Sequence, residues 1–187
     1  MPLPKLNVPK YKLKLPSDNR TVNYRPFLVK EEKLLLLATE TGSQEDIVEA
    51  IKRIIVDCTD IHDIDHLPTF DIEYVFLQIR TKSVGETVEV QVTCPDDEET
   101  VVPVKIPLNE IKVKKDKKHK KEIKLGTDII LTMNYPSLDT FVKMNFQDDE
   151  PTVDAVFEMA AGCVKQIADA EQVYDAMDTP KDELIEF

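Results

Sequence analysis

Glycine is scarce in this sequence, with four residues among 187. Phosphate-binding loops of the Gly-x-Gly-x-x-Gly and Walker types need closely spaced glycines because the backbone must approach the phosphate, and the Gly-x-Ser-x-Gly turn of hydrolases needs them because it is sharp. None of these motifs occurs in the sequence. The sequence therefore predicts neither a phosphate-cradling loop nor a serine nucleophile on such a turn.

Cysteine is also scarce, and long apolar runs are absent. The three cysteines, Cys58, Cys94 and Cys163, are odd in number and far apart, which argues against a secreted disulfide framework and indicates a reducing compartment. No stretch approaches the roughly 18 apolar residues of a membrane span, and the N-terminus lacks the apolar core of a signal peptide. These absences favour a cytoplasmic setting without membrane contact.

The chain is strongly acidic, with a formal net charge of −12. This charge repels nucleic acid and anionic membranes wherever no local basic patch overrides it. The length suffices for a hydrophobic core, in one ordinary domain or two small ones, so neither a disulfide nor a metal is needed on grounds of size. The composition indicates an acidic, soluble protein of mixed helix and strand.

One stretch organises the prediction for the rest of the chain: YRPFLVKEEKLLLLA, at residues 24–38. Pro26 lacks a backbone donor and biases Arg25 toward an extended conformation, so a helix is expected to start after it, from Val29. The four adjacent leucines at 34–37 are strong helix formers and cover most of the helix circumference. We therefore expect this helix to be buried on several sides.

The run from Tyr24 to Leu36 resembles the signature of the baseplate hub assembly proteins of T4-like tailed bacteriophages. The likeness extends through the predicted second and third helices and, more weakly, to the C-terminus. It implies a non-enzymatic viral protein that assists assembly of, or forms part of, the central hub of a contractile tail baseplate. The implied partners are other phage baseplate or hub proteins, and no cofactor, nucleic acid or small-molecule substrate is implied. The implied location is the host cytoplasm during assembly, with the virion tail baseplate as the alternative.

Four segments are predicted along the chain. Residues 1–23 form an extended N-terminal arm, because four prolines exclude helix and apolar residues alternate with lysines at 11–15; the arm is either a loosely ordered terminus or a strand that pairs with a partner. Residues 24–85 are helical. A second helix follows Ser43, with Cys58 among its core residues, and a third begins near Thr69.

The periodicity changes from helical to alternating at Gly85. Residues 86–135 are predicted to form an antiparallel β-hairpin insertion, whose five strands are centred on residues 88–94, 102–106, 111–113, 123–125 and 129–133. Prolines at 103 and 107 push the second of these strands toward a sheet edge.

Residues 136–187 are predicted to be a C-terminal helical acidic part that packs with 24–85 as one unit. Ser137 caps one helix, and Pro151 opens a longer one whose apolar stripe runs through Val164 and Ile167. A last helix starts at Thr179, and Leu184 and Phe187 give it a docking face. Because so short a helix is marginal alone, we expect tertiary or partner contacts to hold it, or the polypeptide to continue. The predicted fold class is α+β, a helical core with an inserted small antiparallel β-sheet of hairpins.

A second function class, a small zinc- or carboxylate-dependent enzyme, has candidate residues in the connector before the third helix. Cys58, His62 and His66 are spaced by four, and with Cys94 they would make four zinc ligands. Helix-breaking aspartates and Pro68 make a continuous helix there improbable. The connector carboxylates show no apolar surroundings that would raise a pKa for acid–base work. We therefore assign no catalytic, cofactor-binding or metal residue.

Eight lysines between Lys112 and Lys124 form the sharpest charge feature, expected at a hairpin tip. One interpretation is a solvated turn whose lysines protect sheet edges from aggregation. The other is docking to an acidic partner, in which the lysines speed encounter and fix register. Nucleic acid is disfavoured because the stretch has no arginine and no aromatic residue to stack on a base. The predicted partner-binding residues are Lys115, Lys117, Lys118, Lys120, Leu184 and Phe187.

Overall fold

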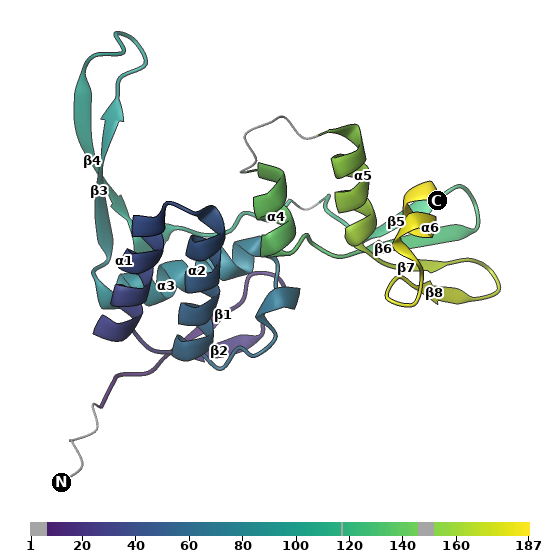
Figure 1. Cartoon of the computed structure of the whole chain (residues 1–187), viewed down its shortest axis with the longest axis horizontal. Coiled ribbons are helices and arrows are strands. Elements are labelled where there is room, and N and C mark those ends of the chain that lie inside the picture. The colour runs from purple at the N-terminus through teal and green to yellow at the C-terminus, as the bar shows by residue number, and fades with distance from the viewer. Residues whose placement is uncertain (1–6, 117, 146–151) are drawn as a thin grey trace. The chain divides into compact units, whose positions relative to one another are not determined.

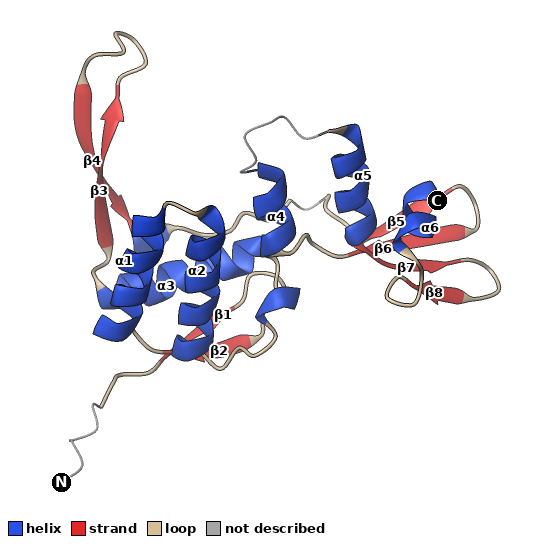
Figure 2. Cartoon of the chain, viewed as in Figure 1, coloured by secondary structure: helices blue, strands red, loops and turns tan. Residues whose placement is uncertain are grey.

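The structure is a computed structural model, and it describes residues 7–116, 118–145 and 152–187. Helices and small antiparallel sheets alternate along these residues (Figures 1 and 2), so the α+β class predicted from the sequence is confirmed. The chain divides into two compact units, one within residues 1–64 and 70–113 and the other within 65–69 and 114–187. None of the described helices has the length and apolar character needed to cross a membrane.

The first unit begins with a hairpin of β1 (Tyr11–Lys14) and β2 (Thr21–Tyr24). The strand predicted from the alternation at 11–15 is present, and its partner is a segment of the same chain. Leu13, Leu15 and Val22 are buried beneath it. The hairpin turn is fastened to a later helix, because the backbone N–H and the hydroxyl of Ser17 both donate to the carboxylate of Asp71.

Three helices complete the body of this unit: α1 (Val29–Thr41), α2 (Gln44–Cys58) and α3 (Thr69–Ser83), with a short 3-10 turn η1 (Ile64–His66) before the last. As predicted, Ser43 caps α2 by accepting the N–H of Asp46, at 3.4 Å. Gly42 ends α1 in the left-handed region, at φ 69°. Fully buried side chains on α2 and α3 are Ile54, Ile55, Ile72, Val75 and Ile79, and they join Leu15 and Val22 of the hairpin in the core.

The prediction that the leucine run would be buried on several sides is wrong. Leu36 is 60% exposed and Leu37 50% exposed, while Leu34 and Leu35 are half-buried. Helix α1 packs mainly against α2, so one side of it is covered and the leucines on the rest of its circumference face solvent. Four adjacent leucines specify a helix, but they do not specify how many neighbours cover it.

A second hairpin, β3 (Thr87–Thr93) and β4 (Val101–Pro107), extends away from the three helices of its unit (Figure 1). A 3-10 turn, η2 (Leu108–Glu110), follows β4. The strand predicted at Ile111 and Val113 is absent: residues 111–116 form no regular element. Both apolar residues stand among lysines, just after η2. This segment therefore has no neighbouring strand, among those described, with which it could pair.

The second unit holds a four-stranded antiparallel sheet in the order β5 (Glu122–Leu125), β6 (Ile129–Met133), β7 (Val164–Ala168), β8 (Val173–Asp175). Three helices accompany it: α4 (Leu138–Asn145), α5 (Val153–Gly162) and α6 (Lys181–Glu186). The strands predicted between 86 and 135 thus belong to two separate sheets.

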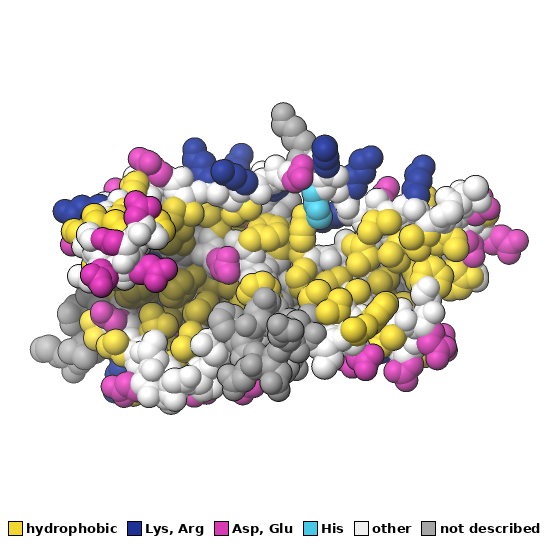
Figure 3. Space-filling model, turned by 90° about the horizontal axis from the view of Figure 1, so that it is seen from above, with side chains coloured by type: hydrophobic (Ala, Val, Ile, Leu, Met, Phe, Trp, Pro, Cys, Tyr) yellow, Lys and Arg dark blue, Asp and Glu magenta, His cyan; other side chains and the backbone are white. Residues whose placement is uncertain are grey.

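The predicted stripe of α5 is too long, because Val164 and Ile167 lie in β7. Both are β-branched, and their strand pairs with β6, which places Ile167 beside Leu131. The sheet register aligns Ile123, Leu131, Ile167 and Tyr174 across the four strands on one face. Hydrophobic side chains gather on the surface of the protein in Figure 3. In this unit, Ile123, Tyr174 and, on α5, Phe157 are among the exposed large apolar residues.

Candidate protein-interaction site

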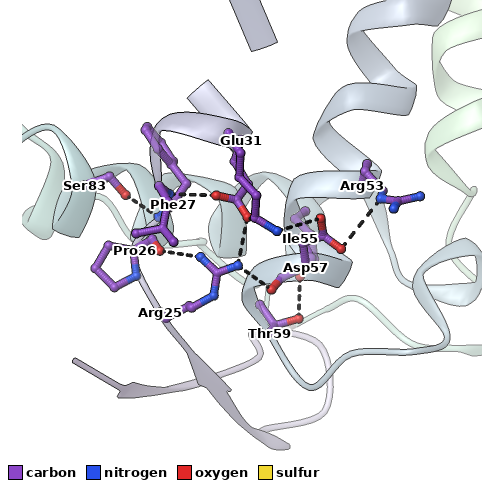
Figure 4. A network of polar contacts seen from close by, with 11 residues as sticks. Arg25, Pro26, Phe27, Glu31, Arg53, Ile55, Asp57, Thr59 and Ser83 are labelled. Atoms are coloured by element: carbon purple, nitrogen blue, oxygen red, sulfur yellow. Dashed lines mark hydrogen bonds and ion pairs between the residues drawn. The ribbon is translucent and has the colours of Figure 1, made fainter. Parts of the chain in front are cut away.

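The segment that precedes α1 and the first turn of that helix form a polar network around Arg25 and Glu31 (Figure 4). Arg25 Nη2 lies 2.8 Å from Glu31 Oε1, and the other carboxylate oxygen accepts the N–H of Leu28 at 2.8 Å. Leu28 precedes α1 in extended conformation, so Glu31 caps the helix from its third position. This network explains locally why the helix begins after Pro26, as the sequence predicts.

Glu31 is a buried carboxylate, with 2% of its surface exposed. Burial alone would raise the pKa of this group, but hydrogen bonds from Arg25, from the Leu28 N–H and from Lys30 outweigh it and hold the pKa below its ordinary value. Glu31 is therefore ionised in the folded protein at neutral pH. A buried charge of this kind stabilises the fold only while its partners remain.

Arg25 also ties the segment to the end of α2. Its Nη2 donates to the carbonyl of Asp57 at 2.9 Å, and its backbone N–H donates to the carbonyl of Cys58 at 2.9 Å. Two residues further on, the N–H of Phe27 donates to Ser83 Oγ, at the C-terminal end of α3, at 2.9 Å. The Tyr24–Leu28 segment thus connects β2, α1, α2 and α3, which makes its role architectural.

A groove of about 680 Å³ lies between α1 and α2. Its lining combines apolar side chains, from Leu34, Leu37, Ala38 and Ala50, with charged ones of both signs, among them Lys30, Asp46, Glu49, Arg53 and Asp57. Apolar and charged side chains occur together in this way in protein–protein interfaces. Leu37, one of the exposed leucines of α1, lines this groove, which makes it a candidate surface for a protein partner.

The zinc candidates are not brought together. Cys58 is buried at the end of α2, whereas His62 and His66 are exposed. Among the residues that the structure describes, no group of three or more His, Cys, Asp or Glu could hold a metal ion. Cys58 lines the core, as the sequence predicts. This burial raises the pKa of its thiol to about 11, which makes it a poor metal ligand or nucleophile.

The carboxylates of the connector have structural partners. Asp60 accepts both the backbone N–H of Asn23, at 3.0 Å, and its side-chain amide, at 2.6 Å. Burial alone would raise the pKa of Asp60, but the hydrogen bonds from Asn23 outweigh it and hold the pKa below its ordinary value. Asp63 faces Arg20, with an ion pair at 3.5 Å. Both side chains therefore fasten the connector to the N-terminal hairpin.

The predicted lysine segment, residues 112–124, does not form a hairpin tip. It connects η2 to β5, because β4 pairs with β3 and β5 pairs with β6. Lys115, Lys118 and Lys120 are exposed as predicted, and Lys117 lies outside the described residues. The end of the segment is held in place by Tyr135, on which His119 stacks at 5.3 Å and over which the Lys121 ammonium lies at 5.7 Å. The described lysines remain directed to solvent.

The C-terminal candidates lie on or beside α6. This helix begins one residue later than predicted, with Pro180 in the cap position and Thr179 donating its hydroxyl to the carbonyl of Asp175. It contacts α5, and Lys181 forms a 3.0 Å ion pair with Glu158 there. Leu184 is half-buried and Phe187 is 60% exposed. A partner-binding role for Leu184 and Phe187 stays a prediction.

Sequence reasoning missed the two buried carboxylates, Glu31 and Asp71. A signal for Glu31 is present, since a glutamate at the third position of a helix is the acidic half of a capping box. The partner of Asp71 was not predictable from local pattern. Asp71 binds Ser17, which is 54 residues away, and no periodicity links two such positions.

Comparison with known proteins identifies a family. No curated protein and no solved structure matches the chain. A family model described as T4 bacteriophage base plate protein matches residues 8–187, which includes the Tyr24–Leu28 segment, the lysine segment and α6. The match covers nearly the whole chain, and it agrees with the resemblance seen in residues 24–36. The chain therefore belongs to the T4 bacteriophage base plate protein family.

Proposed function

We propose that this base plate protein assists assembly of the central hub of a contractile phage tail, or forms part of that hub, through protein–protein contacts in the host cytoplasm. The observation that carries the proposal is the exposure of large apolar side chains in a strongly acidic family member: Leu36 and Leu37 on α1, Phe157 on α5, Val92 on β3, and Val101, Val102 and Val104 on β4. Exposed apolar surface of this extent is typical of proteins that dock on other proteins.

The lysine segment supports the same function. Its exposed ammonium groups stand in a chain of net charge −12, so an acidic partner surface would meet a local field opposite in sign to that of the rest of the molecule. Such complementarity accelerates encounter and fixes orientation more than it adds affinity. The segment and the apolar surfaces together fit a protein that meets several baseplate components.

Affinity purification of a tagged chain from infected cells, followed by identification of co-purifying proteins, tests the proposal. Baseplate hub proteins should be recovered in fixed ratios, and recovery should fall when Leu36 and Leu37 are both changed to serine. The pair Val84→Ser and Val29→Ser, also exposed but outside the groove, is the matched control. Recovery of no hub protein, or equal recovery with every variant, would contradict the proposal. Comparison with mature virions separates an assembly factor from a resident subunit.

A further inference from the structure

The exposed edge of β3 has a sequence that reads almost the same in both directions. Residues 87–93 are TVEVQVT, symmetric about Val90 except that Glu89 stands opposite Gln91. In an antiparallel pair of two identical strands centred on Val90, each residue would face its mirror position in the other copy. Threonine would face threonine, valine would face valine, and glutamate would face glutamine. No like charges would meet.

The hydrogen-bond register shows which residues present this edge. Cys94 N–H donates to the Thr100 carbonyl and Leu108 N–H donates to the Glu86 carbonyl, both at 2.8 Å. Because bonded and non-bonded pairs alternate along an antiparallel ladder, the valines of β3 bond to β4. The residues between them direct their N–H and C=O groups outward: Thr87, Glu89, Gln91 and Thr93.

This edge is open in the part of the chain that the structure describes, where β3 and β4 form a two-stranded sheet by themselves. A two-stranded ribbon is marginally stable in water, and three or more strands stabilise it. The hairpin also extends beyond α1, α2 and α3 (Figure 1), so the strand edge is accessible to another chain. An open edge carrying a single charge, Glu89, lacks the usual protection against strand pairing.

The opposite edge of the hairpin is protected. By the same register, the residues of β4 that face outward are Val101, Pro103, Lys105 and Pro107. Two of these four positions are prolines, which have no N–H to donate, and a third is a lysine. One hairpin edge can therefore accept a strand and the other cannot, which favours a closed pair over an open chain of subunits.

We infer that two copies of this chain pair through antiparallel β3 strands, with a two-fold axis at Val90. The four outward-facing residues of each copy then supply about eight backbone hydrogen bonds across the contact. The result is a four-stranded sheet in the order β4, β3, β3 of the second copy, β4 of the second copy. The inference rests on the strand edge alone and does not depend on the proposed hub function.

Sedimentation velocity of the full chain over a range of concentrations tests the pairing. We expect a monomer–dimer equilibrium, and the variant Gln91→Pro should abolish it by removing an outward N–H from the centre of the edge. Val101→Pro is the matched control, because it removes an outward N–H from the edge of β4 and should leave the dimer intact. Thermal melting of each variant, followed by circular dichroism, verifies that the body of the protein stays folded.

A charge swap gives a milder second test. Gln91→Glu places glutamate opposite glutamate twice in the dimer and should weaken it several-fold. Adding Glu89→Gln in the same chain restores the glutamate–glutamine pairing and should recover most of the lost affinity. A simple structural defect would not be repaired by a second change, so the recovery reports on the pairing itself.

Cross-linking locates the axis. In a Cys94→Ser background and with an added thiol oxidant to accept the two electrons, Val90→Cys should form a disulfide-linked dimer, because residues facing each other at the axis lie within disulfide reach. Val92→Cys faces Val88 of the other copy and should cross-link poorly. A chain that remains monomeric up to about 1 mM, a dimer that survives Gln91→Pro, or equal cross-linking at both positions would overturn the inference.

Discussion

Arg25 and Glu31 form an ion pair that joins the extended segment before α1 to the first turn of that helix, with Nη2 and Oε1 2.8 Å apart. The carboxylate is 2% exposed and the guanidinium side chain 20% exposed. The same guanidinium reaches the carbonyl of Asp57, so the pair also holds the end of α2. A change at either residue should therefore affect three elements at once.

Replacing Glu31 with glutamine should destabilise the first unit by about 2–3 kcal/mol, because Arg25 would lose its charge partner while remaining largely buried. Urea denaturation monitored by circular dichroism measures the loss. Lys30→Ala is the matched control: Lys30 also contacts Glu31, at 3.1 Å, but its side chain is 66% exposed, so its loss should cost under about 1 kcal/mol. Equal effects of the two changes would show that the ion pair with Arg25 has no special weight.

The stability of the protein should fall in acid partly through Glu31. Its pKa in the folded protein lies below the ordinary value of 4.5, so the unfolded chain binds more protons in this range. The stabilisation is fully present above the unfolded pKa and disappears as the pH falls through the lower folded pKa. The unfolding free energy of the parent protein should therefore drop more steeply between about pH 5 and pH 3 than that of Glu31→Gln. Parallel curves would be inconsistent with a depressed pKa.

The three thiols should differ in reactivity. Cys94 is partly exposed in the turn after β3, whereas Cys58 and Cys163 are buried. Burial raises the pKa of both buried thiols, to about 11 for Cys58, so only about a thousandth of Cys58 would be thiolate at pH 8. A chromogenic disulfide reagent should label one thiol rapidly in the native protein and the other two after unfolding. Cys94→Ser should remove the rapid phase, and a rapid phase that persists would contradict the burial of the other two.

Reversing the charge of four lysines in the lysine segment should slow binding to an acidic hub partner. The changes are Lys115, Lys117, Lys118 and Lys120 to glutamate, and the association rate at low salt should fall by about tenfold or more, with a smaller effect at high salt. The melting temperature should stay nearly unchanged, since the described members of this set are exposed. Surface plasmon resonance with purified hub proteins measures the rate.

The control for this experiment is a second quadruple reversal with the same change in net charge. Four exposed lysines of the first unit serve this purpose: Lys10, Lys12, Lys14 and Lys33. If both sets slow association equally, net charge rather than the lysine segment steers the encounter. If neither set has an effect, the lysine segment serves solubility alone.

Deleting residues 179–187 should weaken partner binding or destabilise the second unit, because α6 contacts α5 and is tied to it by the Lys181–Glu158 pair. The pair is exposed, so it should contribute under about 1 kcal/mol, and the apolar residues Leu184 and Ile185 should carry most of any effect. Lys181→Ala alone is the control. A truncated protein with unaltered melting and unaltered binding would identify the segment as dispensable.

Local chemistry predicted much of the fold. The helix starts at Val29 and after Ser43 follow from proline and capping rules, and β3, β5 and β6 follow from alternation. What failed depended on distant neighbours. Val164 and Ile167 fit a helical stripe equally well until β6 is available as a pairing partner, and the exposure of Leu36 depends on how many elements cover α1.

The candidate site was predictable to a lesser degree. The exposure of the lysines at 115, 118 and 120 follows from composition, but their place between two sheets depends on pairing that the segment itself does not encode. The buried role of Asp71 arises from a partner in the distant N-terminal hairpin, Ser17, whereas the partners of Glu31 lie within six residues of it. A carboxylate reads as surface charge in sequence, and only its neighbours make it structural.

The bond between Ser17 and Asp71, together with that between Phe27 and Ser83, sets the order in which the first unit is completed during synthesis. The two contacts span 54 and 56 residues, so the N-terminal hairpin and the start of α1 acquire their last partners only when α3 has left the ribosome. Until then Leu13, Leu15 and Val22, which the finished fold buries, lack their full cover. A nascent chain halted before α3 has emerged from the ribosome would therefore present these apolar side chains to chaperones, and one halted after α3 and β4 have both emerged would not.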